Sequence, residues 1–296
     1  MTAGPWMLRC RASERNAEHA VLAVSSVLFA ASTTLTIVWC ASMSGMGGML
    51  MPGGWTMSMA WMRMPGQTWA GAAASLLGMW VVMMVAMMLP SLVPMLYRYR
   101  EAVTSAAETR LGLLTAMVGT GYFCVWTLFG IVALPLGFAL AEAEMHYPAL
   151  SRAVPTALGV IVLIAGACQF TAWKAHHLAC CRESSAFARG YPRELRRDLA
   201  VAAFSREGGG GRTVPADAGT AWRHGMRLGL HCSCCSAGLT AILLVMGVMD
   251  LRVMAVVTTA ITAERLAPAG ERVARAIGVI VVGAGMLLLA RAAGLQ

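Results

Sequence analysis

Residues 75–97 read SLLGMWVVMMVAMMLPSLVPMLY, and this stretch decides the fold class. It contains no charged side chain. A helix of about 20 apolar residues crosses a hydrocarbon core of roughly 30 Å, so the stretch predicts a transmembrane helix. The chain is therefore expected to lie in a membrane.

The rest of the chain repeats this pattern. It has 296 residues, of which 58% are hydrophobic and only 12% charged, and this composition excludes a water-soluble globule. We expect an all-α fold, a polytopic transmembrane helix bundle of about seven spans. Six spans also fit, because the sixth stretch is short and would otherwise be a re-entrant or interfacial helix. The expected spans lie near residues 20–40, 75–97, 112–140, 154–173, 229–249, 251–267 and 274–293.

The basic residues indicate the orientation. With a cytoplasmic N-terminus, all but four of the 23 Lys and Arg fall in cytoplasmic segments, as the positive-inside rule requires. We expect residues 1–19 to form a cytoplasmic N-terminal segment and residues 20–293 to form one transmembrane domain in the inner (cytoplasmic) membrane. The net charge of +9 then reflects topology and contact with the anionic lipid bilayer, and we expect no nucleic-acid partner.

Two loops have distinct compositions. Residues 175–228 are expected to form a cytoplasmic loop, and residues 41–74 an extracytoplasmic loop rich in methionine. Thioethers are soft ligands that survive an oxidising compartment, so this outer loop is a candidate for metal capture. An amphipathic helix with methionine as apolar filler explains the same pattern. The outer candidates are Met43, Met46, Met49, Met51, Met57, Met59, Met62 and Met64.

A second group of soft ligands is expected on the cytoplasmic side. One cluster stands at the start of the fifth span, and another, which also contains His176, follows the fourth span. Thiols stay reduced in the cytoplasm. Glu264 is an acidic residue in an apolar run, and the cost of placing a charge in a membrane suggests that it has a function. We predict a metal or redox role for the group. The candidate metal ligands are His231, Cys232, Cys234, Cys235, Cys181, His177, Cys180, Met84, Met87, Met88 and Glu264.

The chain resembles a bacterial family of predicted metal-binding integral membrane proteins, domain of unknown function 2182. The resemblance runs from about Trp55 to Ala290 and rests on MWVVMMVAMMLPSLVP, QFTAWKAHHLACCRESSAF, GLHCSCCSAGL and VMGVMDLRVMAVVTTAITAERLAPAG. In the family's pattern, cysteines stand where this chain has His177 and His231. Both exchanges keep a metal ligand but make it less soft. The resemblance implies metal binding.

Soft ligands on both sides of the membrane suggest that Cu(I) passes between sites. We expect a copper transporter, or a chaperone that delivers copper to a cuproenzyme or a periplasmic metal carrier, rather than an enzyme with catalytic residues. Zinc or another transition metal also fits these ligands. Two alternatives stay open. One is a non-catalytic subunit or scaffold of a membrane complex, and the other is a membrane thiol–disulfide oxidoreductase with Cys180–Cys181 and Cys234–Cys235 as reactive pairs.

Overall fold

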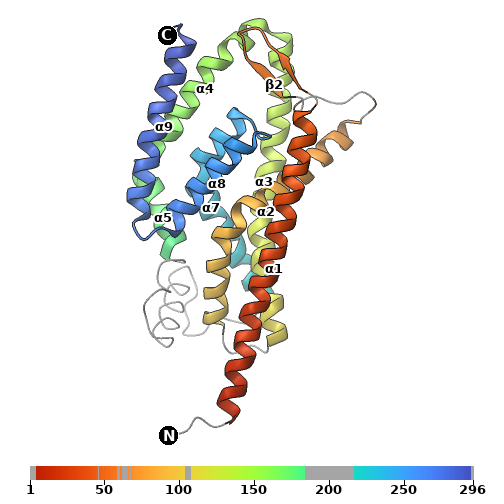
Figure 1. Cartoon of the computed structure of the whole chain (residues 1–296), viewed down its shortest axis with the longest axis vertical. Coiled ribbons are helices and arrows are strands. Elements are labelled where there is room, and N and C mark those ends of the chain that lie inside the picture. The colour runs from red at the N-terminus through yellow and green to blue at the C-terminus, as the bar shows by residue number, and fades with distance from the viewer. Residues whose placement is uncertain are drawn as a thin grey trace.

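The computed structural model describes residues 5–45, 47–58, 61, 66, 68–103, 108–183 and 217–294. In these residues the chain is almost entirely helical and forms an elongated bundle (Figure 1). The expected all-α polytopic bundle is confirmed. Its helices are α1 (Pro5–Ser44), α2 (Trp69–Ala102), α3 (Glu108–His146), α4 (Pro148–Cys168), α5 (Ala172–Glu183), α7 (Ala218–Met246), α8 (Leu251–Leu266) and α9 (Gly270–Ala292). A small antiparallel hairpin joins β1 (Gly48–Leu50) to β2 (Thr56–Ser58).

Six of the described helices are long and apolar enough to cross a membrane, namely α1, α2, α3, α4, α7 and α9. This number matches the lower of the two expected values. The expected span at 251–267 is helix α8, which has 16 residues. Such a helix is about 24 Å long, which is short for a hydrocarbon core of about 30 Å. Helix α8 contacts α7 and leads into α9, which rises beside α4 (Figure 1).

Helix α7 begins at Ala218, well before the predicted start at residue 229. Asp217 caps this earlier start, because its side chain accepts hydrogen bonds from the backbone N–H groups of Gly219 and Thr220. Basic residues in the first turns lower the hydropathy, and this obscured the helix in the sequence pattern. The helix therefore begins before the predicted span.

The additional turns change the position of the cysteines in α7. Cys232 and Cys235 were expected at a helix end, but they lie near the middle of a 29-residue helix. The predicted loop 175–228 contains most of α5 and the first turns of α7, while its residues 184–216 lie outside the described part of the chain. The predicted N-terminal segment 1–19 likewise includes the start of α1.

Helix α2 carries much of the bundle's core and packs against α1 and α3. Trp80 is fully buried and donates a hydrogen bond from its indole Nε1 to the carbonyl oxygen of Trp126 on α3, at 2.9 Å. Next to this contact α2 places a run of buried methionines in the core, among them Met84 and Met88. The methionines of this span are therefore interior residues.

Helices α3 and α7 approach until their backbones touch. The sequence Gly225-Met-Arg-Leu-Gly229 brings two glycines to one face of α7, a spacing common in closely packed membrane helix pairs. A Cβ on Gly225 would lie 2.2 Å from the carbonyl oxygen of Val118, and one on Gly229 would lie 2.8 Å from that of Tyr122. The order of these contacts shows that α3 and α7 run in the same direction.

Helices α4 and α9 form a second close pair, on the left in Figure 1. A Cβ on Gly166 would lie 2.8 Å from the backbone nitrogen of Val282, and one on Gly285 would lie 2.7 Å from that of Leu163. These contacts run in opposite order along the two helices, so the pair is antiparallel.

We expect Gly225→Ala to destabilise the protein by about 1–3 kcal/mol, because the new methyl group collides with the α3 backbone and forces the two helices apart. The shift in thermal unfolding of the detergent-purified protein would measure this loss. Gly119→Ala is the matched control, since a Cβ there meets no atom within 4 Å. Equal unfolding temperatures for both variants would contradict the close packing.

Candidate metal centre

Two cysteine side chains meet inside the bundle. The sulfur of Cys181 on α5 lies 3.7 Å from the sulfur of Cys235 on α7, and the two residues are only 1% and 3% exposed. The hydrogen bond to Cys235, together with burial, raises the pKa of the Cys181 thiol well above its usual range. This shift favours the thiol form of Cys181, and either sulfur can donate the hydrogen bond between them. We call these two residues the thiol pair.

A buried guanidinium faces the thiol pair. Arg265, near the end of α8, is 2% exposed and points Nη2 at the sulfurs of Cys181 and Cys235, at 3.4 and 3.3 Å. Its Nη1 donates to the hydroxyl oxygen of Ser91 on α2, at 2.9 Å. Among the described residues no carboxylate contacts this arginine. A buried charge needs a counter-charge, so the site is suited to hold negative charge on the sulfurs.

A second buried cation is neutralised separately. The ammonium of Lys174 lies 2.7 Å from the Oε2 of Glu264, and both side chains are almost fully buried. The same ammonium also donates to the backbone carbonyl oxygen of Cys235. Burial raises the pKa of Glu264, although the neighbouring Lys174 opposes this shift. The carboxylate of Glu264 is thus paired with Lys174, and Arg265 faces the thiols instead.

Further soft ligands lie beside the thiol pair. The Cys232 sulfur lies 2.8 Å from the hydroxyl oxygen of Tyr122 and 3.9 Å from the thioether sulfur of Met88. The thiol of Cys235 donates a hydrogen bond to the backbone carbonyl oxygen of Cys232, at 3.3 Å. All three sulfur-bearing residues are buried in one core cluster. A third thiol and a thioether therefore stand close to the pair.

The imidazoles form a separate contact. The Nδ1 atoms of His177 and His231 lie 3.2 Å apart, and both residues are half-buried. Cys180 is also half-buried, with its sulfur 3.9 Å from the Nε2 of the exposed His176. Cys234 is half-buried as well. The predicted inner ligands thus separate into a buried sulfur group and a more exposed imidazole group.

The remaining inner candidates, Met84, Met87 and Glu264, lie in or next to the same core. Met84 and Met87 are buried in the core cluster that contains Cys232 and Cys235. Glu264 belongs to the ion pair with lysine described above. The structure thus places both methionines in the same core as the thiols and the acid next to it.

The outer methionines have several environments. Met51 and Met57 of the hairpin are buried against α3, Met49 is exposed, and Met43 packs partly buried against the core. Burial of the first two fits the packing interpretation for those residues. Metal capture by the outer loop stays a prediction. The candidates Met46, Met59, Met62 and Met64 lie outside the described residues.

Sequence reasoning missed Arg265 and Tyr122, and it missed a repeat. The stretches His177-Leu-Ala-Cys-Cys and His231-Cys-Ser-Cys-Cys share the pattern H-x-x-C-C. The structure pairs equivalent members of the two, histidine with histidine and the last cysteine with the last cysteine. This repeat was the signal that could have identified the pairing.

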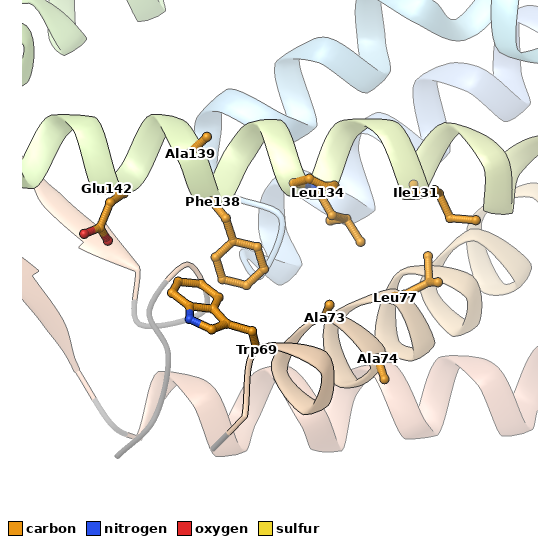
Figure 2. A pocket seen from close by; sticks show the side chains of 11 residues that line it. Trp69, Ala73, Ala74, Leu77, Ile131, Leu134, Phe138, Ala139 and Glu142 are labelled. Carbon is orange, nitrogen blue, oxygen red and sulfur yellow. The ribbon is translucent and has the colours of Figure 1, made fainter. Parts of the chain in front are cut away.

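An apolar cavity lies elsewhere in the bundle. It has a volume of about 580 Å³ and lies between α2 and α3, with Trp69, Leu77, Leu134 and Phe138 in its lining (Figure 2). The lining residues include no thiol, thioether or imidazole. This cavity is therefore no candidate for a soft metal ion. Within the described ranges, no group of three His, Cys, Asp or Glu side chains is arranged to hold a metal ion, so the thiol pair is a two-ligand arrangement.

Comparison with known protein families gives a match to this chain. A family model described as PpoB2, copper chaperone, matches residues 77–288, a range that contains the thiol pair, Arg265 and the imidazole contact. No curated protein and no solved structure matches the chain.

Proposed function

The chain belongs to the PpoB2 copper chaperone family, and we propose that it binds copper as Cu(I) between Cys181 and Cys235 and delivers it to a cuproenzyme. One observation carries the proposal: two buried sulfurs from different helices lie 3.7 Å apart and face a buried guanidinium. Copper is the cargo of this protein.

The sulfur separation supports a shared ion. At a metal–sulfur distance of about 2.3 Å, two ligands of one ion stand about 4 to 4.6 Å apart, so a small movement of α5 against α7 admits the metal. Thiolates are soft ligands and select Cu(I). Cys232 and Met88 are additional soft ligand candidates in the same core, with their sulfurs 3.9 Å apart.

Charge balance supports the monovalent state. Two thiolates and one Cu(I) carry a net charge of −1, which the guanidinium of Arg265 neutralises. A divalent ion such as zinc between the same thiolates would give a neutral group and leave the arginine uncompensated. Because an unpaired buried charge is costly, the site favours Cu(I) over zinc.

Delivery, rather than a scaffold or thiol-exchange role, fits the same residues. A scaffold has no need of a buried arginine facing thiols. Thiol–disulfide exchange requires that a partner's sulfur reach the attacking thiolate, whereas Cys181 and Cys235 are buried. We place the protein in the bacterial inner membrane as a multi-pass protein, with a cuproenzyme or a periplasmic metal carrier as its partner.

An anaerobic titration of detergent-purified protein tests the proposal. Cu(I) is supplied as its bathocuproine disulfonate complex, and the loss of the complex's colour reports transfer to the protein. One equivalent of Cu(I) should be retained tightly and then pass to an added apo-cuproenzyme. A protein that retains no Cu(I), or that instead catalyses disulfide exchange in a model dithiol, would overturn the proposal.

We expect Arg265→Gln to lower Cu(I) affinity by about 10- to 100-fold, the range known for partners just outside the ligands, and to reduce the preference for Cu(I) over zinc. Glutamine keeps a hydrogen-bond donor at this position but removes the charge. Arg265→Lys, which keeps the charge, should retain the preference. Competition titrations with both metals measure the ratio, and an unchanged ratio in Arg265→Gln would rule out the charge argument.

A further inference from the structure

The two H-x-x-C-C stretches place a second pair of ligands next to the thiol pair. His177 precedes Cys181 by four residues, and His231 precedes Cys235 by four. Four residues correspond to one helical turn, about 6 Å along the axis. The structure places these two turns of α5 and α7 side by side. The Nδ1 atoms of the two histidines lie 3.2 Å apart, and the sulfurs of the two cysteines lie 3.7 Å apart.

The imidazole pair, His177 and His231, and the thiol pair differ in solvent exposure. Both histidines are half-buried, whereas both cysteines are almost fully buried. The exposed His176 lies against His177, with ring centroids 5.4 Å apart. The imidazole pair is therefore the ligand set that an approaching partner meets before the thiol pair.

We propose that His177 and His231 form a transfer site, where Cu(I) is held by two imidazole nitrogens on its way between the thiol pair and a partner. This inference rests on the proposed function, because the thiol pair supplies or receives the ion. Imidazole suits copper but is less soft than thiolate, so it binds Cu(I) less tightly. A weaker and more exposed site is what rapid exchange with a partner requires.

The transfer is a ligand exchange without electron transfer. Inward transfer forms a bond from copper to the Cys235 thiolate while one bond to an imidazole nitrogen breaks. The second bond forms to the Cys181 sulfur as the remaining bond to nitrogen breaks. The thiol proton of Cys181 passes to a freed imidazole nitrogen, and copper stays Cu(I) throughout. Outward transfer reverses these steps.

The other explanation of the contact is purely structural, a hydrogen bond that links α5 to α7. Two double variants separate the explanations. His177→Gln with His231→Gln preserves hydrogen bonding but removes the copper ligands. His177→Met with His231→Met removes hydrogen bonding but supplies soft ligands. His146→Gln is the control, because this exposed histidine ends α3 and contacts Glu142.

The measurement is the rate at which bathocuproine disulfonate removes Cu(I) from the loaded full-length protein. The glutamine pair should slow removal by about tenfold or more while leaving the affinity of the thiol pair unchanged. The methionine pair and His146→Gln should exchange near the wild-type rate. A glutamine pair that exchanges at the wild-type rate, or a methionine pair that is equally slow, would overturn the transfer site.

A second measurement uses intact imidazoles, so it does not depend on folding of the histidine variants. Cys181→Ser with Cys235→Ser, given one equivalent of Cu(I), should show nitrogen neighbours at about 2 Å by X-ray absorption. Sulfur neighbours or no bound copper would overturn the transfer site. Failure of the proposed function is distinct, because it appears in the wild-type protein as a lack of tightly held Cu(I).

Discussion

Replacing Cys181 and Cys235 together with serine is expected to abolish tight Cu(I) binding. Serine is close in size to cysteine, so the bundle should keep its packing, but the hydroxyl oxygen is a hard ligand that binds Cu(I) poorly. The affinity for Cu(I) should fall by more than the roughly 100-fold that is seen when a residue contacting the ligands is replaced. Anaerobic competition with bathocuproine disulfonate measures the affinity.

The chain supplies a matched control for this result. Cys180 and Cys234 directly precede the two proposed ligands in sequence and are half-buried rather than buried. Cys180→Ser with Cys234→Ser removes the same number of thiols from the same helices and should leave the tight site intact. If the two double variants lose Cu(I) equally, the tight site does not consist of the thiol pair.

Glu264→Gln is expected to destabilise the protein by about 3–5 kcal/mol, because it leaves the buried ammonium of Lys174 without its counter-charge. The loss should appear as a lower thermal unfolding temperature in detergent. Glu264→Met with Lys174→Met removes both charges and should recover much of the stability, as apolar replacement of buried ion pairs does.

An exposed ion pair provides the comparison. Glu271 and Arg275 lie 3.8 Å apart on α9, and both side chains are more than half exposed. Glu271→Gln should change stability by less than about 0.5 kcal/mol, because water screens surface charges. Equal losses in Glu264→Gln and Glu271→Gln would show that burial does not control the effect.

The sequence was enough to predict most of the helices and to select candidate ligands, because both depend on local properties. A run such as residues 75–97 is apolar regardless of what it contacts, and residue types with soft side chains can be identified directly in the sequence. The start of α7 at Ala218 was missed because capping by Asp217 outweighs the low hydropathy of the basic turns that follow. Hydropathy alone does not report such capping.

Hydropathy and helix patterns did not predict the pairing inside the site, and the H-x-x-C-C repeat was the sequence signal that pointed to it. Cys181 and Cys235 are 54 residues apart, and they meet only because α5 packs against α7. Arg265 resembled one more basic residue at the end of a helix. Its role depends on α8 being short enough to end beside the thiols, a length that the sequence interpretation left open.

The glycine contact between α3 and α7 indicates which part of the candidate metal centre should move. With the carbonyl of Val118 pressed against Gly225, no layer of side chains remains through which these helices could slide, so they behave as one rigid body. That body carries Cys235 and His231. Cys181 and His177 stand on α5, which has only 12 residues. Copper exchange should therefore be a motion of α5 against a stationary α7.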